Sequence, residues 1–194
     1  VSTRAGVPDE VPMPSVSRVN TSTAHLQWQS PEDNGSGITD YYVTMQTGGS
    51  GPFLEKVAST GSGATSTLLT GLLPATVYSF KVAAKNQVGL GPSSLASQPI
   101  VTQIDVPAQI VDPPKPYLQN SALLYLTWLT PVDNGDVIQN YIIESQFRPV
   151  VDVNIGRRLL QQDGLYSPWE VHTHTRDAST WISISDLVPN THYR

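Results

Sequence analysis

The chain has 194 residues, a length that suits two domains of about 100 residues each better than one. Its net charge of −5 and its 11 scattered lysine and arginine residues disfavour nucleic acid as a partner, because phosphate recognition depends on clustered basic side chains. Cysteine is absent, which excludes thiol catalysis and disulfides, and no apolar run approaches the roughly 18 residues of a membrane span.

The first half of the chain contains short segments in which apolar and polar residues alternate. Residues 23–29, TAHLQWQ, place Leu26 and Trp28 on one face, and residues 78–86, YSFKVAAKN, show the same alternation. One apolar and one polar face is typical of an antiparallel sheet that is packed on one side. With 16 prolines and 14 glycines to separate such strands, the pattern predicts an all-β, two-sheet sandwich.

A repeated motif indicates a duplicated domain. Residues 30–43, SPEDNGSGITDYYV, return as TPVDNGDVIQNYII at an offset of 100. A second match, GLLPATVY ending at Tyr78 with DLVPNTHY ending at Tyr193, has an offset of 115. Self-similarity at this period predicts two copies of one domain, the second of which carries extra residues between Tyr141 and its DLVPNTHY motif.

The boundary between the copies is predicted in the proline-rich stretch 101–116, because proline cannot donate a hydrogen bond to a sheet. We therefore expect one domain at 7–104 and a second at 105–194. Residues 1–6 are interpreted as the tail of a preceding repeat. The second domain is expected to lack the end of its sixth strand and all of its seventh, because the chain ends one residue after Tyr193.

The second copy differs from the first mainly in an insertion. Residues 147–171, FRPVVDVNIGRRLLQQDGLYSPWEV, would bring Arg157 and Arg158 close to Tyr166 and Trp169. Mixed basic and aromatic surfaces are enriched at protein interfaces, so this is a candidate protein-binding surface. The interpretation that we favour is a long, partly ordered loop in which Trp169 belongs to the fourth strand and packs as part of the structure. Further along, residues 181–185, WISIS, are expected to leave Trp181 facing outward.

These motifs resemble the fibronectin type III family. The resemblance rests on the tryptophan of the second strand, the Pro-x-Asp-Asn-Gly turn, the Ile-x-x-Tyr of the third strand, the Leu-x-Pro-x-Thr-x-Tyr before the sixth strand, and AAKNQVGLGPSS at 83–94. It covers 7–104 and the whole of 105–194. It implies tandem seven-stranded antiparallel β-sandwiches of the immunoglobulin-like type, the second truncated at its C-terminus.

Six aromatic residues form the structural signature of this family in the chain. The two tryptophans supply large buried area between the sheets, and Tyr78 and Tyr193 resemble the corner tyrosine whose hydroxyl binds backbone groups upstream. The six are Trp28, Tyr41, Tyr78, Trp128, Tyr141 and Tyr193.

Residues suited to catalysis or metal binding are sparse. His172 and His174 share a strand face, but no third ligand lies nearby in the sequence, so a solvated strand face is expected. The pair Glu32 and Asp33 lies in a turn and is not expected to act as an acid–base pair. We expect no enzymatic activity, no catalytic residue, no metal and no cofactor in this segment.

Two N-glycosylation motifs lie in predicted turns, at Asn20-Thr21-Ser22 and Asn34-Gly35-Ser36. Such motifs also arise by chance in a chain with many Asn and Ser residues. Given where the family usually occurs, we expect at least one of the two asparagines to carry a glycan.

The resemblance implies non-catalytic protein-binding and spacer modules, from an extracellular cell-surface receptor or adhesion protein. Their partners would be other proteins and neighbouring repeats of the same chain. One alternative is an intracellular muscle-type scaffold, which occupied glycosylation sites would exclude. Another is an accessory role beside a receptor kinase or phosphatase, or in a secreted enzyme.

Overall fold

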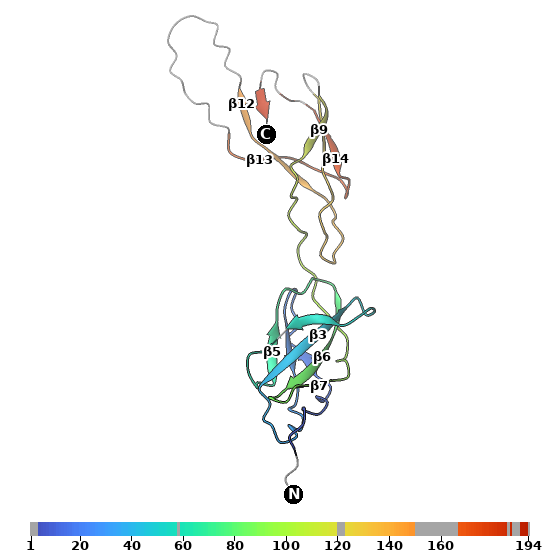
Figure 1. The fold of residues 1–194 in the computed structure, drawn as a ribbon. Coiled ribbons are helices and arrows are strands. Elements are labelled where there is room, and N and C mark those ends of the chain that lie inside the picture. Colours follow the sequence, from blue (N-terminus) through green and yellow to red (C-terminus); the bar gives the residue numbers. More distant parts are fainter. Residues whose placement is uncertain are drawn as a thin grey trace, which may run out of the picture. The chain divides into compact units, whose positions relative to one another are not determined.

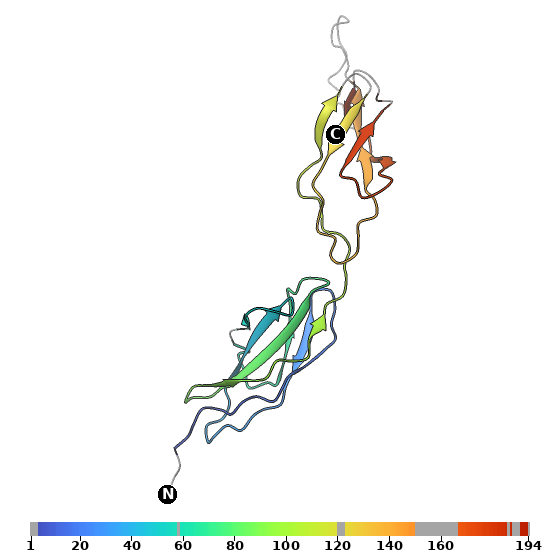
Figure 2. The same ribbon diagram turned by 90° about the vertical axis from the view of Figure 1, so that its right-hand side faces the viewer.

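The computed structural model describes residues 4–57, 59–119, 123–149, 167–185, 187 and 191–193. The chain forms two compact units, Val1–Val106 and Pro107–Arg194, called module 1 and module 2 below. The dividing point lies two residues after the predicted one. All the regular elements among the described residues are β-strands, and every pairing is antiparallel, as Figures 1 and 2 illustrate. The predicted all-β class is confirmed.

Module 1 is a two-sheet sandwich. One sheet has the order β1 (Ser15–Ser17), β2 (Ala24–Gln27), β5 (Ser66–Leu69). The other has the order β4 (Leu54–Val57), β3 (Asp40–Thr47), β6 (Val77–Lys85), β7 (Leu90–Ser93), and β8 (Ile100–Val101) also pairs with β6.

The core of module 1 lies between these sheets and follows the predicted alternation. The ring centroids of Trp28 and Tyr41 are 5.1 Å apart in an edge-to-face arrangement. Strand β6 departs from a simple one-sided pattern, because Ser79 and Ala83 are also buried on its other face. These are small side chains opposite longer ones on β3, and Ala83 lies opposite Tyr42. The buried cluster contains Val11, Ala24, Leu26, Trp28, Tyr41, Val43, Leu69, Leu72, Tyr78, Phe80, Val82 and Ala84.

The predicted seventh strand is divided into β7 and β8. Between them, serine hydroxyls replace part of the regular ladder along β6: the Val82 N–H donates to Ser94 Oγ at 3.0 Å and the Phe80 N–H to Ser97 Oγ at 3.1 Å. The edge of β6 is therefore satisfied without a continuous seventh strand.

Module 2 repeats this plan in its described residues. One sheet has the order β14 (Trp181–Ile184), β10 (Leu124–Thr127), β9 (Lys115–Gln119). Strand β11 (Ile142–Ser145) pairs with β13 (Glu170–His174), and β12 (Phe147–Pro149) pairs with β15 (Thr191–Tyr193). Trp128 and Tyr141 are buried at the same centroid separation as their counterparts, 5.1 Å.

Equivalent strands pair in the same register in the two modules, and this shows where the insertion of module 2 lies in the sequence. Thr47 pairs with Tyr78 in module 1, and Phe147 pairs with Tyr193 in module 2. The difference in residue number between equivalent positions of the two modules is therefore 100 up to Phe147 and 115 at Tyr193. Because Phe147 keeps the first offset, the extra residues follow it, and the return strand β13 starts at Glu170.

Candidate protein-binding surface

The repeated Asp-Asn-Gly segment is a turn in both modules. Asn34 and Gly35 have positive φ values of 53° and 84°, and the Gly35 N–H donates to Asp33 Oδ1 at 2.8 Å. Residues 133–135 form the same turn, with a corresponding bond of 3.1 Å. Asn and Gly tolerate this left-handed backbone, so the motif that appears twice in the sequence serves the fold.

The start of module 1 is hydrogen-bonded to this turn and to the Asn86 side chain. Asn86 is buried and donates from Nδ2 to the Gly6 carbonyl at 2.7 Å, while the Gly6 N–H donates to the Asn34 carbonyl at 3.0 Å. The assignment of residues 1–6 to a preceding repeat stays a prediction, but Gly6 is bonded to the rest of module 1 through both its N–H and its carbonyl group. The alternation of strands could not reveal the Asn86 contact, because it joins residues 80 apart.

The two candidate glycosylation sites differ in how their amides are used. Asn34 Nδ2 donates to the Val7 carbonyl and to Asp9 Oδ1, both at 2.9 Å. An amide nitrogen has two hydrogens, and a glycan on it would remove one of these bonds. Asn20 is exposed and donates one bond, of 3.3 Å, to Thr23 Oγ1. The geometry therefore favours Asn20 as the glycan acceptor.

Asp40 is the acceptor in a polar cluster at the start of β3. Its carboxylate accepts hydrogen bonds from the Ser59 hydroxyl, from the Tyr41 N–H at 2.8 Å and from the Thr60 N–H at 2.9 Å. Burial raises the pKa of this carboxyl, but the bonds from Ser59, Thr60 and Tyr41 outweigh burial and hold the pKa below its ordinary value of 3.8. The Asp40 carboxylate thus holds the loop at 59–61 against the start of β3.

Replacing Asp40 by asparagine is expected to lower the free energy of unfolding of module 1 at pH 7 by about 1 kcal/mol, the usual size for a lost hydrogen-bond set at a partly exposed site. Because the folded-state pKa is depressed, the ionised carboxylate stabilises the fold above 3.8, and this contribution disappears as the pH falls through the folded value. Urea titrations at several pH values should show the gap between wild type and Asp40→Asn narrowing below pH 4. A gap that stays constant into acid would contradict this role.

The residues proposed for the insertion surface lie mostly outside the described residues, namely Arg157, Arg158 and Tyr166. Ser167, near the end of the stretch 147–171, is bonded to Phe147 at its start. The Ser167 N–H donates to the Phe147 carbonyl at 2.9 Å, and the Phe147 N–H donates to Ser167 Oγ at 3.1 Å. Trp169 follows this contact, immediately before β13, and is 55% exposed. It is therefore at the surface, at the point where the chain returns to the sheet.

Metal ligands do not gather in the described part of the chain. It contains no group of three His, Cys, Asp or Glu side chains that could hold a metal ion. His174 is exposed at the end of β13. Among the same residues, a helix with the length and apolarity of a bilayer span is also absent.

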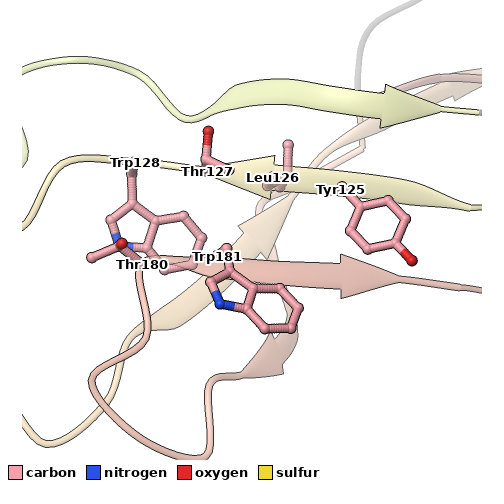
Figure 3. Close-up of a pocket in the computed structure, with 6 residues that line it drawn as sticks. All are labelled: Tyr125, Leu126, Thr127, Trp128, Thr180 and Trp181. Atoms are coloured by element: carbon pink, nitrogen blue, oxygen red, sulfur yellow. The ribbon is translucent and has the colours of Figure 1, made fainter.

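A surface with two aromatic side chains, an exposed tryptophan and a half-buried tyrosine, lies on the β10–β14 sheet of module 2. Trp181 is 57% exposed, and the cross-strand pairs are Thr127 with Trp181 and Tyr125 with Ser183. We call these four residues the β10–β14 surface. A pocket of about 350 Å³ adjoins them, and Figure 3 shows its lining side chains, Tyr125, Leu126, Thr127, Trp128, Thr180 and Trp181.

The corresponding surface of module 1 has a different chemistry. In the same register, His25 pairs with Leu68 and Gln27 with Ser66. The tyrosine and tryptophan of module 2 thus replace a histidine and a serine, while the Trp–Tyr core pair is kept. The outward position of Trp181 was predicted, but its proximity to β10 was missed. Aligning the two copies with both offsets would have revealed the contrast.

Comparisons with known proteins agree with this architecture. The model of the family described as "Fibronectin type III domain" matches residues 9–100. The chain is 29% identical over 180 residues to "Fibronectin type-III domain-containing protein 3a" of Gallus gallus, covering 86% of this chain and 14% of that protein. It is 33% identical over 141 residues to "Neogenin" of Rattus norvegicus, covering 67% of this chain and 10% of that protein.

One solved structure extends over almost the whole chain. The crystal structure of the chicken CNTN1 FN1–FN3 domains covers 97% of this chain and 56% of that one, with a TM-score of 0.55 and 17% identity. This likeness concerns the fold. The chain spans 14% and 10% of the length of these two curated relatives. It resembles the solved structure in consisting of successive β-sandwiches.

Proposed function

Since the chain belongs to the fibronectin type III family, we propose that its modules are non-catalytic protein-binding and spacer units in the extracellular part of a cell-surface receptor or adhesion protein. The β10–β14 surface is the observation that carries the binding role. Trp and Tyr side chains are enriched at the centre of protein interfaces, and this surface carries the exposed Trp181 and the half-buried Tyr125. Here they occupy positions that are His and Ser in module 1.

The polar clusters in the described residues support a non-catalytic role. The Asp40 carboxylate is held by the loop at 59–61, and the Asn86 amide is held by Gly6 and by the Asp33 carbonyl at 3.1 Å. These groups are engaged in bonds within the fold, and none of them is arranged as an acid–base or nucleophile pair.

The double variant Tyr125→His, Trp181→Ser replaces the two aromatic residues of the β10–β14 surface by their counterparts in module 1. It is expected to weaken saturable binding of the labelled chain to cells that express the gene, because a central aromatic anchor contributes about 2 kcal/mol, which is a roughly 30-fold change in Kd. Leu54→Ser, at an exposed position of module 1, is the control and should leave binding unchanged. Equal binding by the double variant would contradict the assignment of this surface.

The extracellular location is tested by the glycan. In protein isolated from the cells that make it, we expect a mass shift that is removed by an N-glycosidase and is located at Asn20. Asn20→Gln should abolish the shift, whereas Asn34→Gln should retain it. Unmodified Asn20 in the native protein would instead favour the intracellular scaffold.

A further inference from the structure

Strand β14 forms the outer edge of its sheet in the described part of module 2. The Trp128 N–H donates to the Thr180 carbonyl at 3.0 Å, so these two residues form a hydrogen-bonded pair. Antiparallel strands alternate between bonded and non-bonded pairs, so the next bonded pair is Leu126 with Ile182. The backbone N–H and C=O groups of Trp181 and Ser183 consequently point away from β10, where they can pair with another strand.

Within its described residues, 180–184 (TWISI), this edge carries neither a charge nor a proline, two of the features that protect edge strands. The opposite edge strand of the same sheet, β9, carries Lys115 and Pro116. In module 1, the end of the equivalent strand β5 is capped by Lys56, whose Nζ donates to the Thr70 carbonyl at 2.7 Å.

We propose that β14 pairs with β14 of a second copy of this chain, antiparallel, about a two-fold axis that passes beside Ile182. This inference names a partner for the β10–β14 surface and so rests on the proposed binding function. In this register, Trp181 lies opposite Ser183 of the second copy, and each of the two equivalent pairs exchanges both backbone hydrogen bonds. The β10–β14 sheets of the two copies join into one sheet.

The residues of β14 fit this self-pairing better than an arbitrary partner strand. An uncharged strand meets no like charge when it faces itself, so the symmetric pair has no electrostatic penalty. The large outward side chain, Trp181, and the small one, Ser183, are two residues apart, so the two-fold axis places each large residue beside a small one. Because Tyr125 pairs with Ser183 on the other side, the aromatic residues of the two copies then share one continuous face.

Sedimentation velocity on the full chain over a range of micromolar concentrations tests the pairing. We expect a monomer–dimer equilibrium for the wild type. Ser183→Pro removes an N–H that points away from β10, and Ser183→Lys adds one charge on each side of the axis, opposite Trp181 of the other copy, so both should weaken dimerisation by more than 30-fold. Leu68→Lys, the matched change on β5 of module 1, should leave the dimer intact. Circular dichroism checks that each variant keeps its strands.

The register has its own test, because the chain contains no cysteine. Ile182→Cys should form an intermolecular disulfide under mild oxidation, since Ile182 faces itself across the axis, whereas Ser183→Cys should cross-link poorly. A wild type that stays monomeric at every concentration would overturn the inference, as would dimers that persist in both Ser183 variants. If cell binding still falls in the Tyr125→His, Trp181→Ser variant, the proposed binding function survives with a different protein as partner.

Discussion

Replacing Trp28 by alanine is expected to lower the free energy of unfolding of module 1 by about 3–5 kcal/mol, the range found when a buried aromatic side chain is deleted. Trp28 is 7% exposed and contacts Tyr41 within the buried cluster between the sheets. Its Nε1 is buried without a hydrogen-bond partner, so the loss is one of packing. Since a domain of this size has a stability of about 5–15 kcal/mol, the variant should be close to unfolding at 37 °C.

The matched control is Trp181→Ala in module 2, which removes the same side chain from an exposed position. Surface substitutions usually change stability by less than about 0.5 kcal/mol, so this variant should unfold like the wild type. Urea denaturation followed by circular dichroism is the suitable measurement, because module 1 contains a single tryptophan and Trp28→Ala removes its fluorescence. Similar losses in the two variants would show that burial does not determine the effect.

The sequence predicted the buried faces well, because a strand repeats every two residues and the repeat supplied each motif twice. Leu26 and Trp28, assigned to one face by alternation alone, are both buried. The hydrogen bonds made by Ser94 and Ser97 could not be predicted in this way, because a hydroxyl that replaces a ladder bond leaves no periodic signal. The interruption between β7 and β8 was missed for the same reason.

The candidate surface was harder to predict than the core. Tyr125 and Trp181 are far apart in the sequence, and the register of β10 with β14 places them on the same face of the sheet. Sequence reasoning instead offered, as its candidate surface, residues that are neighbours in the chain, such as Arg157 and Arg158. Two threonines outside the repeated motifs also occupy equivalent positions. The Thr60 N–H donates to the Tyr41 carbonyl at 3.0 Å, and the Thr175 N–H donates to the Tyr141 carbonyl at 2.9 Å. The offset of 115 relates these two threonines.

Replacing Gly91 by alanine is expected to destabilise module 1 by about 1–3 kcal/mol, the usual cost of forcing extra atoms into a packed site. A Cβ at this position would collide with the carbonyl oxygen of Pro8 and lie 3.1 Å from its carbonyl carbon, and the Ala84 oxygen is 3.4 Å away. The opposing atoms are backbone, so no side chain can rotate to relieve the contact. Pro8 is itself fully buried, which limits how far its segment can move.

Gly37→Ala provides the control, because no atom lies within 4 Å of its Cβ position. There the alanine restricts the unfolded chain without a clash, so stability should stay the same or rise by about 0.4–1 kcal/mol. Thermal unfolding should separate the two variants, since 1 kcal/mol shifts Tm by roughly 4–8 °C in a domain of this size. The segment at Gly6–Asp9 is held by Asn86 and by the Asp9 N–H bond to the Glu32 carbonyl at 3.0 Å. If Gly91→Ala is as stable as Gly37→Ala, that segment must be able to move away from β7 at little cost, and its bonds to Asn86 and Glu32 contribute little to the fold.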